Sequence, residues 1–426
     1  MVAHTIATET PGAIVAELAD GGLLVDAMAH PEGASSVVTA ALSRRTANGR
    51  HGGLRGQPRR SRAMAPLRSA TDVHVLGVEQ SNSSVLVAGK YIAKLIRRLE
   101  PGDNPDVELP AHLAAVGFEH APGVAATLDV DLDGETERAN LVVIHDAVGN
   151  NGDLWAAVLD ELSYDIEQGR PFDVEREAWL PALLGRRTAE LHDHLRRPAG
   201  GDGSSRGSAM EPIAFTLLWQ RSLLQTLRNS VQSTQRALRR SKIDVPEAAA
   251  LMRPLDDVLA RFDRLRTEKL DAKRIRVHGD LHLGQILRTG NDVTFIDFEG
   301  EPGRPIGERR IMRCPLVDVA GLVRSFDYAG RSALDTAIAR GLADDDGSLD
   351  EPRAAWTEWA CRTMIDAYLA AAEPSGLIPA APENAGLLLD VFALDKALYE
   401  VRYELAHRPG WVGWPLAAVN AMIRAE

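Results

Sequence analysis

The sequence has few cysteines and no long apolar run, and these shortages exclude several classes of protein. Only two cysteines, Cys314 and Cys361, occur in 426 residues. They are too few for a disulfide framework or a cysteine-based zinc site, so we expect a reducing compartment. No run of about 18 apolar residues occurs, which excludes a membrane-spanning helix. Residues 1–30 have no basic segment followed by an apolar one, so we expect no secretory signal and predict a cytoplasmic protein.

Charge is unevenly distributed along the chain. The 48 basic and 60 acidic residues give a formal net charge of −12, which argues against a general nucleic-acid binder. The segment from Arg44 to Arg68 nevertheless contains eight arginines and no acidic residue. Such a segment could bind a polyanion, but its glycines and prolines are typical of a solvated loop. We therefore predict a mobile loop over residues 44–68.

The order of the predicted elements indicates a two-lobe α+β fold. Residues 73–150 contain short strand-like runs, turn signals and one helical stretch, whereas residues 151–426 are mostly helical around one short β-hairpin. This order predicts an antiparallel sheet and disfavours a parallel dinucleotide-binding fold. Residues 1–72 would form a small N-terminal cap subdomain. We expect strands over 73–77, 84–87, 91–96, 125–130, 141–144, 274–278 and 286–298, and helices over 105–117, 175–196, 213–238, 245–270, 317–328, 351–372, 382–406 and 415–424.

A polar stretch in otherwise apolar surroundings marks the predicted hairpin. If its turn has three residues, Thr289 pairs with Val293. Counting back four residues on each strand then places Gln285 opposite Asp297, with Asp280 just upstream. Amide and carboxylate oxygens are the ligands that Mg²⁺ prefers in proteins. The hairpin therefore predicts a magnesium site.

The spacing of these residues matches a known catalytic pattern. In protein kinases a His-x-Asp-x-x-x-x-Asn loop is followed by Asp-Phe-Gly. Here His278, Asp280 and Gln285 fall at the same intervals, and Asp-Phe-Glu-Gly-Glu-Pro over residues 297–302 begins where Asp-Phe-Gly would. A single such dipeptide could be a turn or a buried pair, but the joint pattern favours a kinase. The string His-Gly-Asp-Leu-His over residues 278–282 resembles the aminoglycoside phosphotransferase and choline kinase superfamily, in particular its maltokinase-like branch.

This resemblance implies a bilobal protein-kinase-like fold that uses ATP and Mg²⁺. It makes residues 73–150 the ATP-binding lobe with its hinge, and residues 151–426 a helical lobe with the catalytic hairpin over residues 278–300 and the acceptor site. Asp280 would accept the proton of the acceptor hydroxyl. The metal would be held by Gln285, Asp297 and Glu299.

The resemblance also implies a set of nucleotide-binding residues in the first lobe. Lys94 lies in a predicted strand and would neutralise the α- and β-phosphates, held there by Glu108 of the following helix. The turn where kinases carry a glycine-rich loop has no glycine, so backbone amides and short polar side chains would cradle the phosphates. The expected contributors are Gln80, Ser81, Asn82 and Ser83 in this turn, and Ile144 and Asp146 at the hinge that binds adenine.

The acceptor is expected to be a small sugar. Maltokinases tend to carry an arginine where this chain has Val317, and a related group of actinobacterial glucosamine kinases shares the motifs quoted above. We therefore expect glucosamine to be converted to glucosamine 6-phosphate, since its ammonium pairs well with a partly buried carboxylate. The alternatives are a maltokinase that forms maltose 1-phosphate, an aminoglycoside phosphotransferase, and a catalytically silent binding module. No nucleic-acid or membrane partner is expected, and a monomer is favoured. Candidate acceptor residues are His282, Glu301, Asp318, Glu400, Glu404, Trp411 and Trp414.

Overall fold

The computed structural model describes residues 14–19, 22–49, 52–59, 73–76, 82–132, 135, 137–174, 178–198, 210–241, 246–301 and 303–424. The chain forms two compact units. The first comprises residues Met1–Asn150 and Thr294–Arg310, and the second comprises Asn151–Val293 and Ile311–Glu426. The division after residue 150 falls where the sequence places the lobe boundary. Residues 294–310, which the sequence analysis assigned to the second lobe, instead belong to the first unit.

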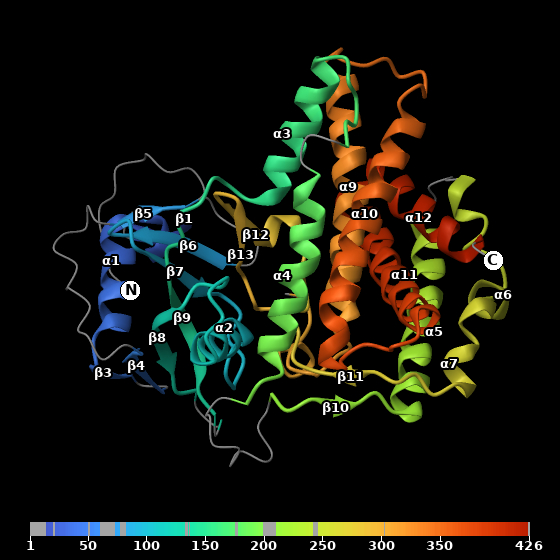
Figure 1. Cartoon of the computed structure of the whole chain (residues 1–426). Coiled ribbons are helices and arrows are strands. Elements are labelled where there is room, and N and C mark those ends of the chain that lie inside the picture. The colour runs from blue at the N-terminus through green and yellow to red at the C-terminus, as the bar shows by residue number, and fades with distance from the viewer. Residues whose placement is uncertain are drawn as a thin grey trace. The chain divides into compact units, whose positions relative to one another are not determined.

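The first unit is built on one antiparallel sheet of seven strands (Figure 1). Its spatial order is β3-β4-β8-β9-β7-β6-β5. The helix α2 (Pro105–Ala115) begins at an Asn104 cap and follows β7. The predicted α+β class with an antiparallel first lobe is confirmed. The strands are β3 (Thr46–Gly49), β4 (Gly52–Pro58), β5 (Val73–Val75), β6 (Asn82–Val87), β7 (Tyr91–Ile96), β8 (Val124–Val130) and β9 (Ala139–Asp146).

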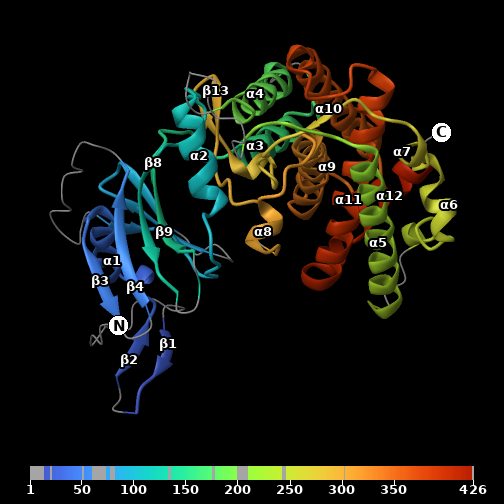
Figure 2. The ribbon, with the colours of Figure 1, turned by 90° about the horizontal axis from the view of Figure 1, so that it is seen from below.

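The N-terminal segment shares a core with this sheet. The helix α1 (Pro31–Leu42) places Val38 and Ala41 in one buried cluster with Val85 and Ile144 of the strands. The short strands β1 (Ile14–Glu17) and β2 (Leu23–Val25) form a separate hairpin, visible beside the sheet in Figure 2. The predicted cap is therefore continuous with the sheet lobe and has no core of its own among the described residues.

Part of the arginine-rich segment is a β-hairpin, not a loop as the sequence predicted. The strands β3 and β4 pair with each other, and β4 pairs with β8. Arg55 lies opposite Asp129, so one of the arginines has a carboxylate across the strand pair. A Cβ at Gly56 would lie 1.9 Å from the backbone oxygen of Ser43, so this glycine allows β4 to approach the end of α1. The glycine that suggested a loop is a packing residue of the sheet.

The second unit is mainly helical. Figure 1 shows α9, α10 and α11 running side by side, and α10 also packs on α4. A Cβ at Gly185 of α4 would lie 2.2 Å from the backbone oxygen of Met364, so this contact requires glycine. The predicted helix over 245–270 is interrupted, since Pro246 and Pro254 lack the backbone N–H that a helix interior needs. The longer helices are α3 (Leu154–Glu167), α4 (Trp179–Leu195), α5 (Leu217–Ser241), α9 (Leu316–Ala339), α10 (Asp350–Ala372), α11 (Pro382–His407) and α12 (Gly413–Arg424).

The predicted hairpin near the polar stretch is present, with a shorter turn. The strands β12 (Ile286–Thr289) and β13 (Asp292–Phe295) form a two-stranded sheet. Only Gly290 and Asn291 lie between them, and the left-handed φ of 67° falls on Gly290. The turn thus has two residues, not three, because strand pairing extends to Asp292. The count that placed Gln285 opposite Asp297 therefore does not hold.

The structure also describes the two cysteines and the hydropathy of the helices. Cys314 and Cys361 are both free thiols, and burial raises the pKa of each to about 12. None of the helices in the described part of the chain has the length and hydropathy of a membrane span.

Candidate active site

The predicted phosphate-binding lysine lies at the centre of a carboxylate cluster. Lys94 of β7 is 6% exposed, and its amine pairs with Asp297, lies 3.6 Å from Asp106 and lies 3.5 Å from Glu299. Burial opposes the charged amine, but these three carboxylates outweigh it and raise the pKa of Lys94 above its usual value. The first unit therefore holds a charged lysine among three carboxylates.

Asp106, not Glu108, is the helix carboxylate that pairs with this lysine. Asp106 is buried at the start of α2, where Asn104 accepts from its backbone N–H at 2.9 Å. Glu108 instead pairs with Arg310 at 3.4 Å. Two residues along a helix turn the side chain by about 200°, so Asp106 and Glu108 point in nearly opposite directions. The predicted Lys94–Glu108 pair is wrong by this half-turn.

Asp106 also fixes the segment that carries the Asp-Phe-Glu motif. Its carboxylate accepts from the backbone N–H of Phe298 at 3.0 Å and lies 3.3 Å from the ring of His145. Burial alone would raise the pKa of Asp106, but Lys94 and His145 lower it well below its usual value. One buried carboxylate thus joins the strand lysine to the motif backbone.

The two acidic residues of the motif differ in environment. Asp297 has a left-handed φ of 63°, a conformation that costs a non-glycine residue of order 1 kcal/mol and that occurs often at functional sites. Glu299 is buried and accepts from the side-chain amide of Asn82 at 3.0 and 3.2 Å. Burial, together with Asp297 and Asp106, raises the pKa of Glu299 to about 7 against the opposing charge of Lys94. The predicted metal ligands Asp297 and Glu299 therefore lie together around Lys94.

The other predicted nucleotide-binding residues have different outcomes. Ser83 of β6 accepts a hydrogen bond from Arg97, which directly follows β7. Ile144 lies inside the central strand β9, opposite Ala93 on one side and Ala126 on the other, so the sheet takes its backbone groups. The backbone N–H of Asp146 donates to Gly123 at 2.9 Å. The Ile144 backbone is therefore not available to adenine, contrary to the sequence expectation. Gln80 and Ser81 lie outside the described residues.

A buried aspartate of α9 binds the backbone of the loop that carries Asp280. Asp318 of α9 is 1% exposed, and its two oxygens accept from the backbone N–H groups of His278 and Gly279, both at 2.9 Å. Its carboxylate also lies 3.1 Å from the ring of His192. Burial alone would raise the pKa of Asp318, but these partners hold it below its usual value. Asp318 therefore supports the loop. This differs from the role predicted from the sequence, where Asp318 was a candidate acceptor ligand.

A close backbone contact fixes the same loop. A Cβ at Gly321 of α9 would lie 2.3 Å from the backbone oxygen of Leu281. Leu283 donates its backbone N–H to Ser325 at 3.0 Å, and His282 accepts from the backbone N–H of Gly284 at 3.1 Å. Gln285 ends the short 3-10 turn Leu283–Gln285 that these contacts stabilise. The ring of His282 is therefore used inside the loop.

The carboxylate of Asp280 has a lysine partner that sequence reasoning missed. Lys396 of α11 donates to it at 2.8 Å, and both side chains are 22% exposed. Lys396 precedes Glu400 and Glu404 by one and two helical turns, so the spacing that singled out those glutamates also places Lys396 on their face. The helical repeat was the signal that could have identified it.

The predicted acceptor carboxylates of the second unit are already paired. Glu400 accepts from Arg324 at 2.9 Å, and burial raises the pKa of Glu400 despite the charges of Arg324 and Lys396. Glu404 is buried and accepts from Tyr328 at 3.3 Å and from Arg408 at 2.8 and 3.0 Å. These residues form a charged cluster on α9 and α11 close to Lys396.

The two predicted tryptophans lie next to this cluster, whereas Glu301 belongs to the other unit. The rings of Trp411 and Trp414 stack at 4.2 Å, and the guanidinium of Arg408 lies 4.3 Å from the Trp411 ring. Glu301 belongs to the first unit and pairs with Arg304. The second unit thus brings together Glu400, Glu404 and the tryptophans.

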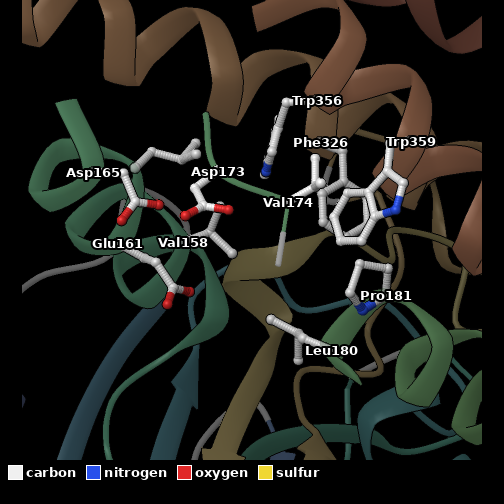
Figure 3. Close-up of a pocket in the computed structure, with 11 residues that line it drawn as sticks. Val158, Glu161, Asp165, Asp173, Val174, Leu180, Pro181, Phe326, Trp356 and Trp359 are labelled. Atoms are coloured by element: carbon white, nitrogen blue, oxygen red, sulfur yellow. The ribbon is translucent and has the colours of Figure 1, made fainter. Parts of the chain in front are cut away.

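A pocket lies elsewhere in the second unit (Figure 3). Trp356, Trp359 and Phe326 supply its apolar wall, and Glu161, Asp165 and Asp173 line the other side. It contains none of the residues predicted from the sequence. The pocket is therefore separate from the chemistry described above.

Comparison with known proteins identifies the fold and the relatives. No protein-family model matches the chain. A solved glucosamine kinase in complex with glucosamine, ADP and inorganic phosphate superposes with a TM-score of 0.68 at 23% identity, covering 95% of this chain and 86% of that one. The glucosamine kinase of Streptacidiphilus jiangxiensis is 29% identical over 350 residues, which are 79% of this chain and 70% of that protein. The glucosamine kinase of Mycolicibacterium smegmatis is 29% identical over 369 residues, which are 81% and 78% of the two chains.

The chain therefore has the protein-kinase-like fold that its motifs predict. Within that class it is similar to two glucosamine kinases, which confirms the predicted resemblance to this group.

Proposed function

We propose that this protein is an ATP-dependent glucosamine kinase that forms glucosamine 6-phosphate and ADP. The observation that carries the proposal is the carboxylate of Asp280, which is partly exposed on a loop whose backbone Asp318 holds in place. Burial opposes its ionisation, yet Lys396 and the neighbouring histidines hold the pKa of Asp280 below its usual value. A fixed, ionised carboxylate can orient a hydroxyl and accept its proton. The two glucosamine kinase relatives support the choice of acceptor.

Phosphoryl transfer in this reaction depends mainly on positioning and charge neutralisation, because the transition state is loose. Lys94 would pair with the α- and β-phosphates of ATP, with Asp106 keeping its amine in place. Asp280 would orient the acceptor hydroxyl toward the γ-phosphorus and accept its proton. Asp280 need not be a strong base for this role.

The residues that would hold Mg²⁺ are Gln285, Asp297 and Glu299. An amide and two carboxylates fit a cation that prefers oxygen ligands and shares its remaining positions with water and phosphate. The described residues contain no group of three His, Cys, Asp or Glu side chains arranged to hold a metal. When bound, the ion would neutralise charge on the β- and γ-phosphates.

The acceptor ammonium would pair with a carboxylate of α11. Glu400 is the better candidate, because it lies one helical turn beyond the lysine that contacts Asp280, whereas Glu404 is buried and both its oxygens accept from Tyr328 and Arg408. Trp411 and Trp414, whose rings stack on each other, are the candidate aromatic residues for contact with a sugar ring. A small-molecule acceptor accounts for this arrangement, and the cytoplasmic location remains a prediction.

The test is an ADP-release assay with glucosamine, N-acetylglucosamine, glucose, maltose and a panel of aminoglycosides. N-Acetylglucosamine and glucose lack the ammonium, so kcat/KM for glucosamine should exceed theirs by roughly tenfold or more, as expected for a hydrogen bond to a charged group. Phosphorus NMR of the product would locate the phosphate. A preference for maltose or an aminoglycoside would refute the acceptor, and the lack of any ATP turnover would favour a silent binding module.

A further inference from the structure

The ion pair between Lys396 and Asp280 joins α11 to the catalytic loop. Among the described residues, Lys396 is the one hydrogen-bond partner of the Asp280 carboxylate, and it contacts Oδ1 at 2.8 Å. That contact leaves the second oxygen, Oδ2, for an acceptor hydroxyl. The contact spans 116 residues of sequence, so it depends on the fold of the whole second unit.

Lys396 is itself held in place by its neighbours. Its amine lies 5.3 Å from the centre of the Tyr399 ring, a distance at which a cation is attracted to the ring face. Glu400 follows one turn later on α11 and is bound by Arg324, which also pairs with Asp327 at 2.9 Å. Positive and negative charges thus alternate from Asp280 through Lys396 and Glu400 to Arg324. Because Lys396 lies between two carboxylates, the positions open to its amine are limited.

We propose that Lys396 is a positioning residue for phosphoryl transfer, which holds the carboxylate of Asp280 ionised and turned so that its other oxygen meets the acceptor hydroxyl. This inference rests on the proposed function. In the step, the acceptor oxygen forms a bond to the γ-phosphorus, and the bond from that phosphorus to the β–γ bridging oxygen breaks. The hydroxyl proton passes to Asp280 and ADP departs.

The other charged groups near Asp280 do not replace this lysine. His278 and His282 belong to the same loop and lower the pKa of Asp280 less than Lys396 does. Asp318 of α9 binds the loop backbone, and its charge is negative, opposite to that of Lys396. Since burial favours the protonated acid, removal of Lys396 leaves Asp280 in surroundings that raise its pKa.

The first test measures the carboxyl group directly and needs no substrate. In protein labelled with ¹³C at the aspartate carboxyl, the Asp280 signal is assigned by its loss in D280N and titrated in wild type, K396M and K396R. We expect the apparent pKa of Asp280 to rise by at least about one unit in K396M, corresponding to the loss of a close opposite charge. K396R should stay near wild type because it keeps the charge. An unchanged titration in K396M would overturn the proposal.

The second test is the pH dependence of turnover. The acidic limb of kcat/KM should move to higher pH in K396M by the same interval, with kcat reduced about tenfold or more and KM for ATP unchanged. K269M is the matched control, because Lys269 is exposed and the substitution removes the same charge. A wild-type acidic limb in K396M would contradict the role, even if kcat fell.

Failure of the proposed function and failure of the Lys396 proposal give different results. If K396M does not fold, K396Q replaces it in both experiments, since glutamine removes the charge and can still donate a hydrogen bond. If wild type phosphorylates no glucosamine, the proposed function fails, while the carboxyl titration still decides the effect of Lys396 on Asp280. If glucosamine is turned over and the titrations of K396M and wild type coincide, the proposed function stands and this inference fails.

Discussion

The amine of Lys94 lies 3.6 Å from the carboxylate of Asp106, and that carboxylate also accepts from the backbone of Phe298. One residue at the start of α2 therefore fixes both the strand lysine and the Asp-Phe-Glu segment. The two contacts give Asp106 a role that Glu108 does not share, because Glu108 points away from this side and pairs with Arg310.

Replacement of Asp106 should impair ATP use more than replacement of Glu108. D106N removes the charge that holds Lys94, so kcat/KM for ATP should fall by about tenfold or more. E108Q removes the Arg310 pair instead, and its effect should be smaller. Steady-state kinetics of both variants would decide between them, and a larger loss in E108Q would restore the pair predicted from the sequence.

Asp280→Asn should separate binding from chemistry. The proposed nucleotide-binding residues do not include this carboxylate, so the ATP dissociation constant should change little. Transfer should fall by roughly 10² to 10⁴, the usual contribution of a positioned acid or base. Calorimetric titration with ATP and a turnover assay measure the two effects, and retention of more than a few per cent of activity would contradict the assignment.

Asp297→Ala should raise the Mg²⁺ concentration needed for activity. Asp297 is a proposed metal ligand, and its loss leaves fewer oxygen ligands on the protein. The half-saturating Mg²⁺ concentration should increase about tenfold, measured as activity against free Mg²⁺ at saturating ATP. An unchanged Mg²⁺ curve would show that the metal is held elsewhere.

Gly321→Ala should disturb the catalytic loop. Its new Cβ would lie 2.3 Å from the backbone oxygen of Leu281, so the helix or the loop must shift, at a cost of about 1–3 kcal/mol in stability. kcat should fall while ATP binding persists. Gly386 of α11 has open space around it, so G386A is the matched control and should leave stability equal or about 0.5–1 kcal/mol higher. Urea unfolding of both variants tests this. A G321A variant as stable as wild type would show that the loop moves at no cost in free energy.

The stabilising effect of Asp318 should depend on pH. Its folded pKa is below the ordinary value of 3.8, so its contribution is present above about pH 4 and is lost as the pH falls toward the folded pKa. D318N should lower the free energy of unfolding by about 2 kcal/mol at pH 7, and the difference from wild type should shrink below pH 4. D256N is the control, since the Asp256 side chain is 83% exposed. A difference that stays constant with pH would refute the electrostatic origin.

Local patterns in the sequence were enough to predict much of the first lobe. Tyr91–Ile96 and the helix after Asn104 carry their own signals, namely strand-forming residues and a cap followed by proline. The hairpin of β3 and β4 carries glycine and arginine, and only its long-range pairing with β8 makes it part of the sheet. Local propensity cannot predict such pairing.

The motifs of the site could be predicted from the sequence, but the residues that contact these motifs could not. The spacing of His278, Asp280 and Asp297 identified the chemistry because these residues follow one another along a short segment. The partner of Asp280 comes from position 396, and the burial of Asp318 depends on how α9 packs. Both are properties of tertiary packing, which assigns opposite roles to acidic residues that look alike in the sequence.

The discontinuous make-up of the first unit limits how the protein can be divided for study. A fragment ending at Asn150 would contain Lys94 and Asp106 but would lack residues 294–310, and with them Asp297, Phe298 and Glu299. Its strand lysine would retain one of its three carboxylate partners, and Asp106 would lose the backbone amide that it accepts from. An isolated first unit would therefore have to be built with the second segment joined to the first by a linker, or made by coexpressing both pieces.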